Sequence, residues 1–175
     1  MHKVAVIGMP GSGKTKALNL FKQLGAIRIN LDEVARDLLE QGTVEYKVVV
    51  ETFGKGILLD SGDIDRRKLR TKITHDKSSR AILNEIMFPS IDMEYKQRIA
   101  SLPEASTVAV EIPLMENNDD GYFDDVVLVV ADKAVKIDRI MKRDNCSAHD
   151  ANALINLHPS DKERRKFATF VLDNS

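Results

Sequence analysis

Residues 8–15 read GMPGSGKT and fit the pattern G-x-x-x-x-G-K-[ST] at every position. Before them, residues 3–8 (KVAVIG) are a β-branched run that stops at glycine, which predicts a short buried parallel strand. After them, the spacing of Ala17, Leu18 and Phe21 predicts the apolar face of a helix over residues 14–24. A glycine loop between a strand and a helix points successive N–H groups and a helix dipole at one anion. This stretch therefore predicts a P-loop that binds a nucleoside triphosphate.

The residue types of the loop also predict individual roles. Lys14 can reach the β and γ phosphates, and the Thr15 hydroxyl can ligate Mg²⁺. We therefore expect ATP and Mg²⁺ at this site. The residues of the loop expected to bind them are Gly8, Pro10, Gly11, Ser12, Gly13, Lys14, Thr15 and Lys16.

Composition excludes several classes of partner. The chain has 175 residues, which predicts one domain, and its formal net charge is −1. With this net charge, the chain as a whole has no positive electrostatic field that would attract nucleic acid or an anionic membrane. Neither is therefore an expected partner. The single cysteine, Cys146, fits a reducing cytoplasm. We expect a cytoplasmic monomer or weak homo-oligomer that acts on a small molecule.

Strands and helices alternate along the chain, which predicts a parallel sheet covered on both faces. Five strands are expected, over residues 3–8, 26–29, 107–112, 126–130 and 170–172. The expected fold is an α/β P-loop NTPase of three layers. The core would span residues 1–42 and 103–175, with a helical lid near residues 133–160 and a helical acceptor-binding insertion near residues 43–102.

Helix boundaries in the insertion and near the C-terminus follow from local signals. Helices are expected over residues 63–74 and 77–87, and Pro89 is expected to begin another that runs to about residue 102. Ser160, with Glu163 three residues later, predicts a capping box for a helix over residues 161–168.

Two carboxylates occupy positions where a P-loop enzyme needs acids. Asp32 follows the second strand, where it can orient an acceptor hydroxyl as a base or can stabilise a helix N-terminus. Glu111 ends an apolar strand, where it can hold Mg²⁺ or be a solvated strand end. The residues leave both pairs of interpretations open.

Basic residues gather in three places. Arg139 and Arg143 are four residues apart on one expected helix, near Lys136 and Lys142, and can either close over a triphosphate or form a solvated face. A second cluster in the expected insertion can meet a substrate phosphate or form a solvated surface, and the surface is the more common interpretation; it consists of Arg66, Arg67, Lys68 and Arg70. Arg164, with its neighbour Arg165, is read in the same way.

Three classes of P-loop protein compete for this sequence. A GTPase switch normally carries an N-K-x-D signature, and the sequence contains none. Motor ATPases are usually larger. A short chain with helices inserted between strands favours a small-molecule kinase.

Several segments together resemble the dephospho-coenzyme A kinase family, over nearly the whole chain. The segments that carry the resemblance, besides the P-loop, are LGA at 24–26, DEVAR at 32–36, FG at 53–54, IL at 57–58, GDIDR at 62–66, LR at 69–70, Pro89, IPL at 112–114, VVLVV at 126–130, Arg139, RD at 143–144 and LDNS at 172–175.

The resemblance implies transfer of the ATP γ-phosphate to the ribose 3′-hydroxyl of dephospho-CoA. Lys14, Asp32 and Arg139 would then be catalytic, and Arg143 would join the nucleotide-binding residues. Thr15 and Glu111 would hold the metal. The acceptor would contact Asp32, Arg36, Arg66, Arg70 and Pro113.

The chain also differs from the family pattern. Met9 and Pro10 replace the usual loop interior, Asn30 replaces the first acid of a D-x-D pair, and Phe88 replaces a histidine. Two alternatives therefore stay open: a kinase for another nucleotide or nucleoside, and a regulatory protein that binds nucleotide without turnover.

Overall fold

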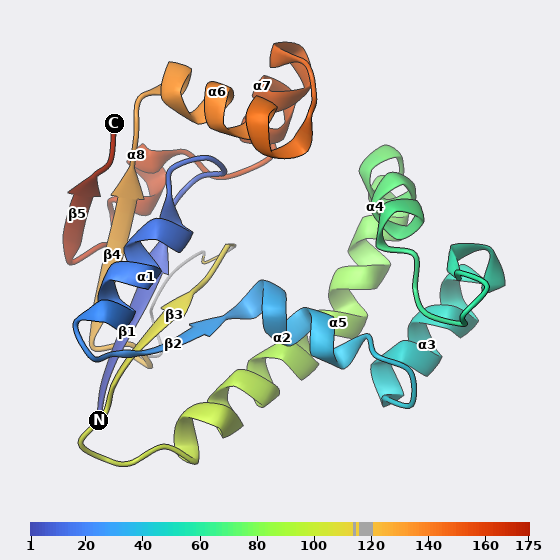
Figure 1. Cartoon of the computed structure of the whole chain (residues 1–175), viewed down its shortest axis with the longest axis horizontal. Coiled ribbons are helices and arrows are strands. Elements are labelled where there is room, and N and C mark those ends of the chain that lie inside the picture. The colour runs from blue at the N-terminus through green and yellow to red at the C-terminus, as the bar shows by residue number, and fades with distance from the viewer. Residues whose placement is uncertain (114, 116–120) are drawn as a thin grey trace. The chain divides into compact units, whose positions relative to one another are not determined.

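The computed structural model of the chain describes residues 1–113, 115 and 121–175, so Leu114 of the IPL segment lies outside the described residues. The described chain contains strands and helices, with a run of helices between its second and third strands and another between its fourth and fifth (Figure 1). Its elements are β1(His2–Ile7), α1(Lys14–Gln23), β2(Ile27–Asn30), α2(Leu31–Leu38), α3(Val44–Phe53), the 3₁₀ helix η1(Lys55–Ile57), α4(Arg66–His75), α5(Lys77–Ala100), β3(Thr107–Glu111), β4(Asp125–Val130), α6(Lys133–Asp144), α7(Ala148–Asn156), α8(Asp161–Arg164) and β5(Phe170–Asp173).

The five strands form one parallel sheet in the order β2-β3-β1-β4-β5, which confirms the expected α/β fold. β1 lies between β3 and β4, so the P-loop leaves from the middle of the sheet. Ala17 and Leu18 of α1 pack against Val6 and Ala109, and all four are buried. This burial of apolar surface fixes the start of α1 over the carboxyl ends of the strands, where α/β sheets bind ligands.

The chain divides into two compact units, each described here by itself. One contains Met1–Asn30 and Leu102–Ser175, and the other contains Leu31–Ser101. The second unit starts earlier than the expected insertion at residue 43, because α2 packs against α5. Its core is apolar and includes Val49, Phe53, Ile57 and Met87.

One expected helix boundary is wrong. Pro89 does not begin a helix but lies inside α5, which runs without a break from Lys77 to Ala100. Proline removes one helical hydrogen bond and crowds the preceding turn. Packing outweighs that cost here, because Met87, Tyr95 and Ile99 are buried along the same helix.

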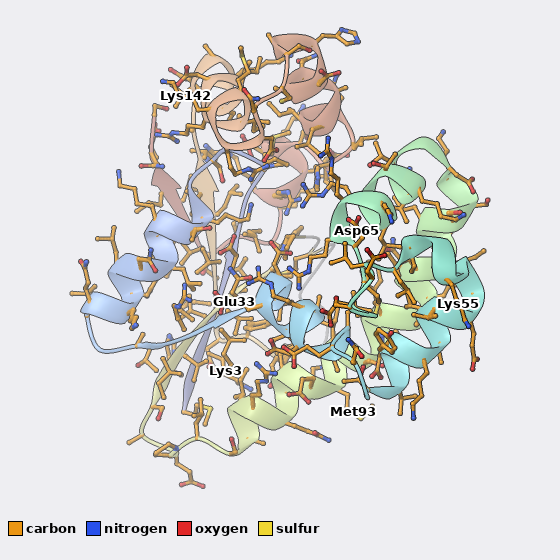
Figure 2. The ribbon with its side chains drawn as sticks, turned by 45° about the vertical axis from the view of Figure 1, so that its right-hand side comes forward. Lys3, Glu33, Lys55, Asp65, Met93 and Lys142 are labelled. Atoms are coloured by element: carbon orange, nitrogen blue, oxygen red, sulfur yellow. The ribbon has the colours of Figure 1, made fainter. Side chains whose placement is uncertain are left out.

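Two other helices are shorter than expected. α4 begins at Arg66, because the Asp65 carboxylate accepts hydrogen bonds from the N–H groups of Arg67 and Lys68 and so caps the helix there (Asp65 is labelled in Figure 2). The predicted capping box of Ser160 and Glu163 is present, but α8 ends at Arg164 instead of residue 168. None of the described helices is both long enough and apolar enough to cross a membrane.

Candidate active site

The P-loop has the backbone that its glycines predict. Gly11 and Gly13 have φ angles of 78° and 96°, which other residues rarely adopt. A Cβ atom on Gly11 would come within 2.5 Å of the Lys136 carbonyl oxygen, and one on Gly13 would strike the Asn174 amide. Both positions therefore require glycine for conformation and for space. Lys14 Nζ donates to the carbonyls of Gly8 and Met9 at 3.1 and 3.3 Å, which holds its charge within the loop.

Side chains from outside the loop hold its outer carbonyls. Arg139 Nη1 donates to the carbonyls of Gly11 and Ser12 at 3.3 and 3.4 Å, and its Nη2 donates to the Asn174 carbonyl at 2.8 Å. Asn174 Nδ2 also donates to the Ser12 carbonyl at 2.9 Å, and its Oδ1 accepts from Lys16 at 3.2 Å. These hydrogen bonds from outside the loop hold the peptide groups of Gly11 and Ser12 in one orientation.

Asn174 is a residue of this site that sequence reasoning did not select. Its only signal was the LDNS ending, which was noted for its resemblance and was given no role. Asn174 follows β5, and its backbone N–H donates to the Val130 carbonyl at 2.9 Å. This pairing places its side chain beside a loop 162 residues earlier in the chain.

The two residues expected to hold a metal lie together. Thr15 Oγ1 donates to Glu111 Oε2 at 3.2 Å and to Oε1 at 3.4 Å. Asn30 and Glu111 are paired across β2 and β3, and Asn30 Nδ2 donates to Glu111 Oε2 at 3.2 Å. Glu111 is 5% exposed, so it is a buried, hydrogen-bonded acid at the end of its strand rather than a solvated one.

This donor set fits Mg²⁺ in particular. Within residues 1–113, 115 and 121–175, no group of three or more His, Cys, Asp or Glu side chains gathers to form an all-protein metal cage. Mg²⁺ in phosphate sites is usually held by one or two protein oxygens, with phosphates and water supplying the rest. The Thr15 hydroxyl and the Glu111 carboxylate are protein oxygens of this kind, so the residues present fit such a site.

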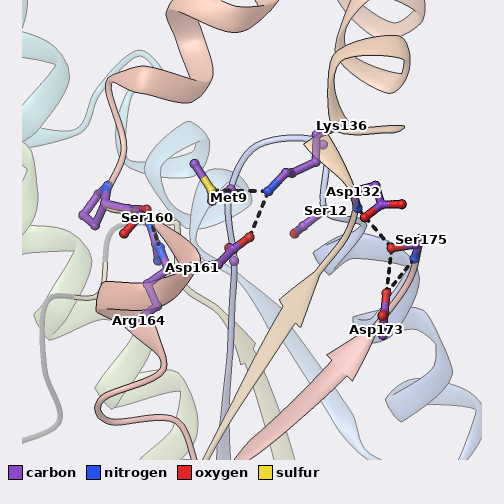
Figure 3. A network of polar contacts seen from close by, with 12 residues as sticks. Met9, Ser12, Asp132, Lys136, Ser160, Asp161, Arg164, Asp173 and Ser175 are labelled. Carbon is purple, nitrogen blue, oxygen red and sulfur yellow. Dashed lines mark hydrogen bonds and ion pairs between the residues drawn. The ribbon is translucent and has the colours of Figure 1, made fainter. Parts of the chain in front are cut away.

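The basic residues of α6 do not form one stripe. Lys136 is 5% exposed, and its Nζ forms an ion pair with Asp161 at 2.8 Å (Figure 3). Arg139 turns onto the P-loop, whereas Arg143 pairs with Asp144 at 2.7 Å. Lys142, labelled in Figure 2, is exposed and pairs with Asp138 at 2.8 Å, as the spacing of four residues predicts. Lys136 and Arg139 therefore lie on the side of α6 that contacts the P-loop, whereas Lys142 lies on its exposed side.

Arg164 does not lie at the surface, where the sequence predicts it. It was read as a surface residue, but it is fully buried. Its Nε donates to the Pro159 carbonyl at 3.2 Å and its Nη2 donates to the Pro113 carbonyl at 3.1 Å. The predicted acceptor residue Pro113 is thus tied through its backbone to α8. Charge alone gave no sign of this burial, because one of the accepting carbonyls, that of Pro113, lies 51 residues away in the sequence.

The second unit contains the remaining expected site residues. Asp32 and Arg36 are four residues apart on α2, and Arg66 and Arg70 are four apart on α4, so each pair shares a helix face. The pKa of the Arg66 guanidinium is lowered by burial and then by the positive charges of Arg36 and Arg70. The charges of Arg36 and Arg70 therefore act on Arg66, and those of Asp37 and Glu40 act in the opposite direction.

α4 also lines a hollow of about 650 Å³ in the same unit. Its lining includes the apolar side chains of Phe53 and Ile57 and three cationic side chains. The lining residues are Phe53, Gly56, Ile57, Asp65, Arg67, Lys68, Thr71 and Lys72. Arg67 and Lys68 belong to the basic cluster for which contact with a substrate phosphate is one interpretation of the sequence.

Comparison of the sequence with known proteins identifies the family of this chain. The family model described as dephospho-CoA kinase matches residues 2–175. The chain belongs to the dephospho-CoA kinase family. It is 35% identical to dephospho-CoA kinase from Bacillus licheniformis over 97% of this chain and 88% of that protein. It is 36% identical to the relative of the same name from Mycolicibacterium paratuberculosis, of which it spans 43%.

A solved structure extends the likeness to three dimensions. TT1252 from Thermus thermophilus superposes on this chain with a TM-score of 0.80 at 26% identity. The match covers 99% of this chain and 88% of that one. The dephospho-CoA kinase family assignment and the P-loop kinase fold therefore rest on agreement along the whole chain.

Proposed function

We propose that this member of the dephospho-CoA kinase family transfers the γ-phosphate of ATP to the ribose 3′-hydroxyl of dephospho-CoA and so forms CoA. The observation that carries the proposal is the P-loop site itself: Lys14 beside the loop carbonyls and Thr15 bonded to Glu111. The family match over residues 2–175 supports dephospho-CoA as the acceptor.

The reaction would need little covalent chemistry from the protein. The 3′-oxygen forms a bond to the γ-phosphorus, the bond from that phosphorus to the β–γ bridging oxygen breaks, and ADP leaves. The acceptor proton passes to the Asp32 carboxylate. When bound at Thr15 and Glu111, Mg²⁺ neutralises charge on the phosphates.

The other contributions come from positioning and charge. Lys14 would exchange its carbonyl partners for β- and γ-phosphate oxygens, and Arg139 would keep the loop N–H groups turned inward. Arg36, Arg66 and Arg70 would meet the acceptor's phosphates. A cytoplasmic location and a monomeric or weakly associated state remain predictions.

The test is an acceptor panel with the purified chain, ATP and MgCl₂. ADP release is followed together with mass-spectrometric detection of the phosphorylated product. Dephospho-CoA is expected to give CoA, at a rate well above the ATP hydrolysis seen without acceptor. Because Asn30 departs from the family's paired acids, nucleosides and nucleoside monophosphates belong in the panel. Turnover on one of those alone would replace the acceptor, and tight ATP binding without turnover on any would indicate a regulatory protein.

A further inference from the structure

Asn174 uses both ends of its side-chain amide on the P-loop and α1. Its Nδ2 donates to the Ser12 carbonyl at 2.9 Å, and its Oδ1 accepts from Lys16 Nζ at 3.2 Å. An amide can donate at one end and accept at the other, whereas an ionised carboxylate can only accept. The two contacts therefore match the chemistry of an asparagine, which joins the loop to the first turn of α1.

The contact with Ser12 lies where there is little space. Ser12 is fully buried, and a Cβ atom on the adjacent Gly13 would strike the Asn174 amide. A buried carbonyl that loses a donor is not readily compensated by water, so the loss costs more than it would at an exposed position. The amide of Asn174 is therefore part of the packing that defines the shape of the loop.

The backbone around Asn174 is anchored on both sides. Ser175 Oγ accepts from the Asp132 N–H at 3.0 Å and donates to Asp173 Oδ1 at 2.8 Å (Figure 3). The Asn174 N–H donates to the Val130 carbonyl at 2.9 Å, beyond the last pair of β4 and β5. Because the backbone is already held, little further conformational entropy is lost when the side chain meets the loop.

Arg139 completes a ring of contacts around the loop. Its Nη2 donates to the Asn174 carbonyl at 2.8 Å, and its Nη1 donates to the carbonyls of Gly11 and Ser12 at 3.3 and 3.4 Å. Asn174, Arg139 and Ser12 therefore each contact the other two. Removal of one member of such a ring frees the others to move, so their contributions to binding are expected not to add.

We propose that Asn174 is a positioning residue of the P-loop, and that its side-chain amide acts with Arg139 as one unit that sets the affinity for the nucleotide. Asn174 acts through Ser12 and Lys16 rather than by touching the reacting atoms. The inference rests on the proposed function only in taking ATP as the ligand, and its tests measure loop position and binding rather than transfer.

The first experiment measures the position of the loop without nucleotide. The Ser12 N–H donates to the Met9 carbonyl at 3.1 Å, so its exchange with solvent, followed by NMR, reports opening of the loop. Asn174→Ala is expected to speed this exchange about tenfold. Asn19→Ala is the matched control, because Asn19 is an exposed asparagine of α1 that accepts from Arg28 of β2. Equal exchange of Ser12 in Asn174→Ala and the wild type overturns the proposal.

The second experiment is a calorimetric titration with ATP and Mg²⁺. Asn174→Ala is expected to weaken the affinity about fivefold, the effect of one net hydrogen bond, and Asn19→Ala is expected to bind as the wild type does. Asn174→Asp keeps the shape of the side chain and the acceptor for Lys16 but cannot donate to Ser12, so it should lose at least as much. Wild-type affinity in Asn174→Asp overturns the proposal.

A double-mutant cycle tests whether the two residues act as one unit. Arg139→Met is expected to weaken ATP binding about tenfold, and independent effects would then give about fiftyfold in the double variant with Asn174→Ala. As one unit, the double variant is expected to lose only about tenfold. A loss that equals or exceeds the product of the two single losses overturns the coupling with Arg139.

Steady-state kinetics separate positioning from stability. A variant that is merely less stable would contain less active protein and show a lower apparent kcat with an unchanged KM for ATP. Asn174→Ala is expected instead to raise the KM for ATP about fivefold and to leave the KM for dephospho-CoA unchanged. Failure of transfer with intact exchange and binding responses would count against the proposed function only, and if the wild type binds no ATP, the exchange of Ser12 decides.

Discussion

The Thr15 hydroxyl donates to both carboxylate oxygens of Glu111, at 3.2 and 3.4 Å. The two residues come from the start of α1 and the end of β3, and the sheet brings them together because β3 lies beside β1. Asn30 completes the group from β2. A P-loop hydroxyl and a strand-end acid therefore already form one hydrogen-bonded unit in the protein.

Glu111→Gln is expected to raise the Mg²⁺ concentration needed for half-maximal turnover by about 10- to 100-fold, because the amide no longer carries the charge that the metal shell needs. A Mg²⁺ titration at saturating ATP measures this. Glu104→Gln, at an exposed loop position, is the control. An unchanged Mg²⁺ requirement in Glu111→Gln would remove Glu111 from the metal site.

Gly11→Ala is expected to destabilise the fold by more than about 2 kcal/mol and to abolish tight ATP binding. Its Cβ atom adds a 2.5 Å contact with the Lys136 carbonyl to the strain of a left-handed backbone. Gly25→Ala is the matched control, since Gly25 also has a positive φ, of 93°, but has open space around it. Its cost is expected to be strain alone, about 1 kcal/mol. Urea denaturation of both variants compares the two, and equal losses would rule out the contact with α6.

Arg139→Met is expected to lower the affinity for ATP about tenfold, because the carbonyls of Gly11 and Ser12 lose the donor that turns them outward. Calorimetric titration with ATP measures the change. Lys142→Met removes a cation from the exposed face of the same helix and should leave the affinity unaltered. Wild-type affinity in Arg139→Met would mean that Asn174 alone holds the loop.

Lys14→Ala is expected to reduce turnover by roughly 100- to 1000-fold, the effect of removing one donor from a developing phosphate charge. Steady-state kinetics with ATP and dephospho-CoA give the change. Lys22→Ala removes an exposed lysine near the end of α1 and serves as the comparison. Wild-type rates in Lys14→Ala would exclude phosphoryl transfer at the P-loop.

Asp32→Asn is expected to lower turnover by about 100- to 10,000-fold while the affinity for ATP stays the same, because the amide cannot accept the acceptor's proton. Turnover and ATP binding are measured separately. Asp60→Asn, at an exposed position of the same unit, controls for loss of one charge. If turnover survives in Asp32→Asn, Asp32 is only the acid at the start of α2.

Local signals predicted local features well. The capping box at Ser160 and the positive φ of the P-loop glycines depend on residues within a few positions, and both are present. Pro89 was a local signal that failed, because the apolar face of α5 continues across it and is buried on both sides. A helix boundary predicted from one proline does not take this burial of apolar side chains into account.

Arg164 and Asn174 mark where sequence reasoning stops. Arg164 donates to a carbonyl 51 residues away, and Asn174 to one 162 residues away. Backbone carbonyls are the same in every residue, so no pattern of side chains indicates which of them will accept. Only the order of strands in the sheet decides that β5 ends beside the P-loop.

By itself, the sequence determined the phosphate loop, the parallel α/β fold and the resemblance to one kinase family. Those depend on residue types at fixed short spacings, which dictate backbone geometry and the chemistry of a few side chains. Only the tertiary structure decided that Glu111 is hydrogen-bonded to Thr15, that Arg164 is buried and that Asn174 donates to the Ser12 carbonyl. These relationships arise when distant segments exclude water from the same space, where burial and charge act between neighbours that the chain order does not reveal.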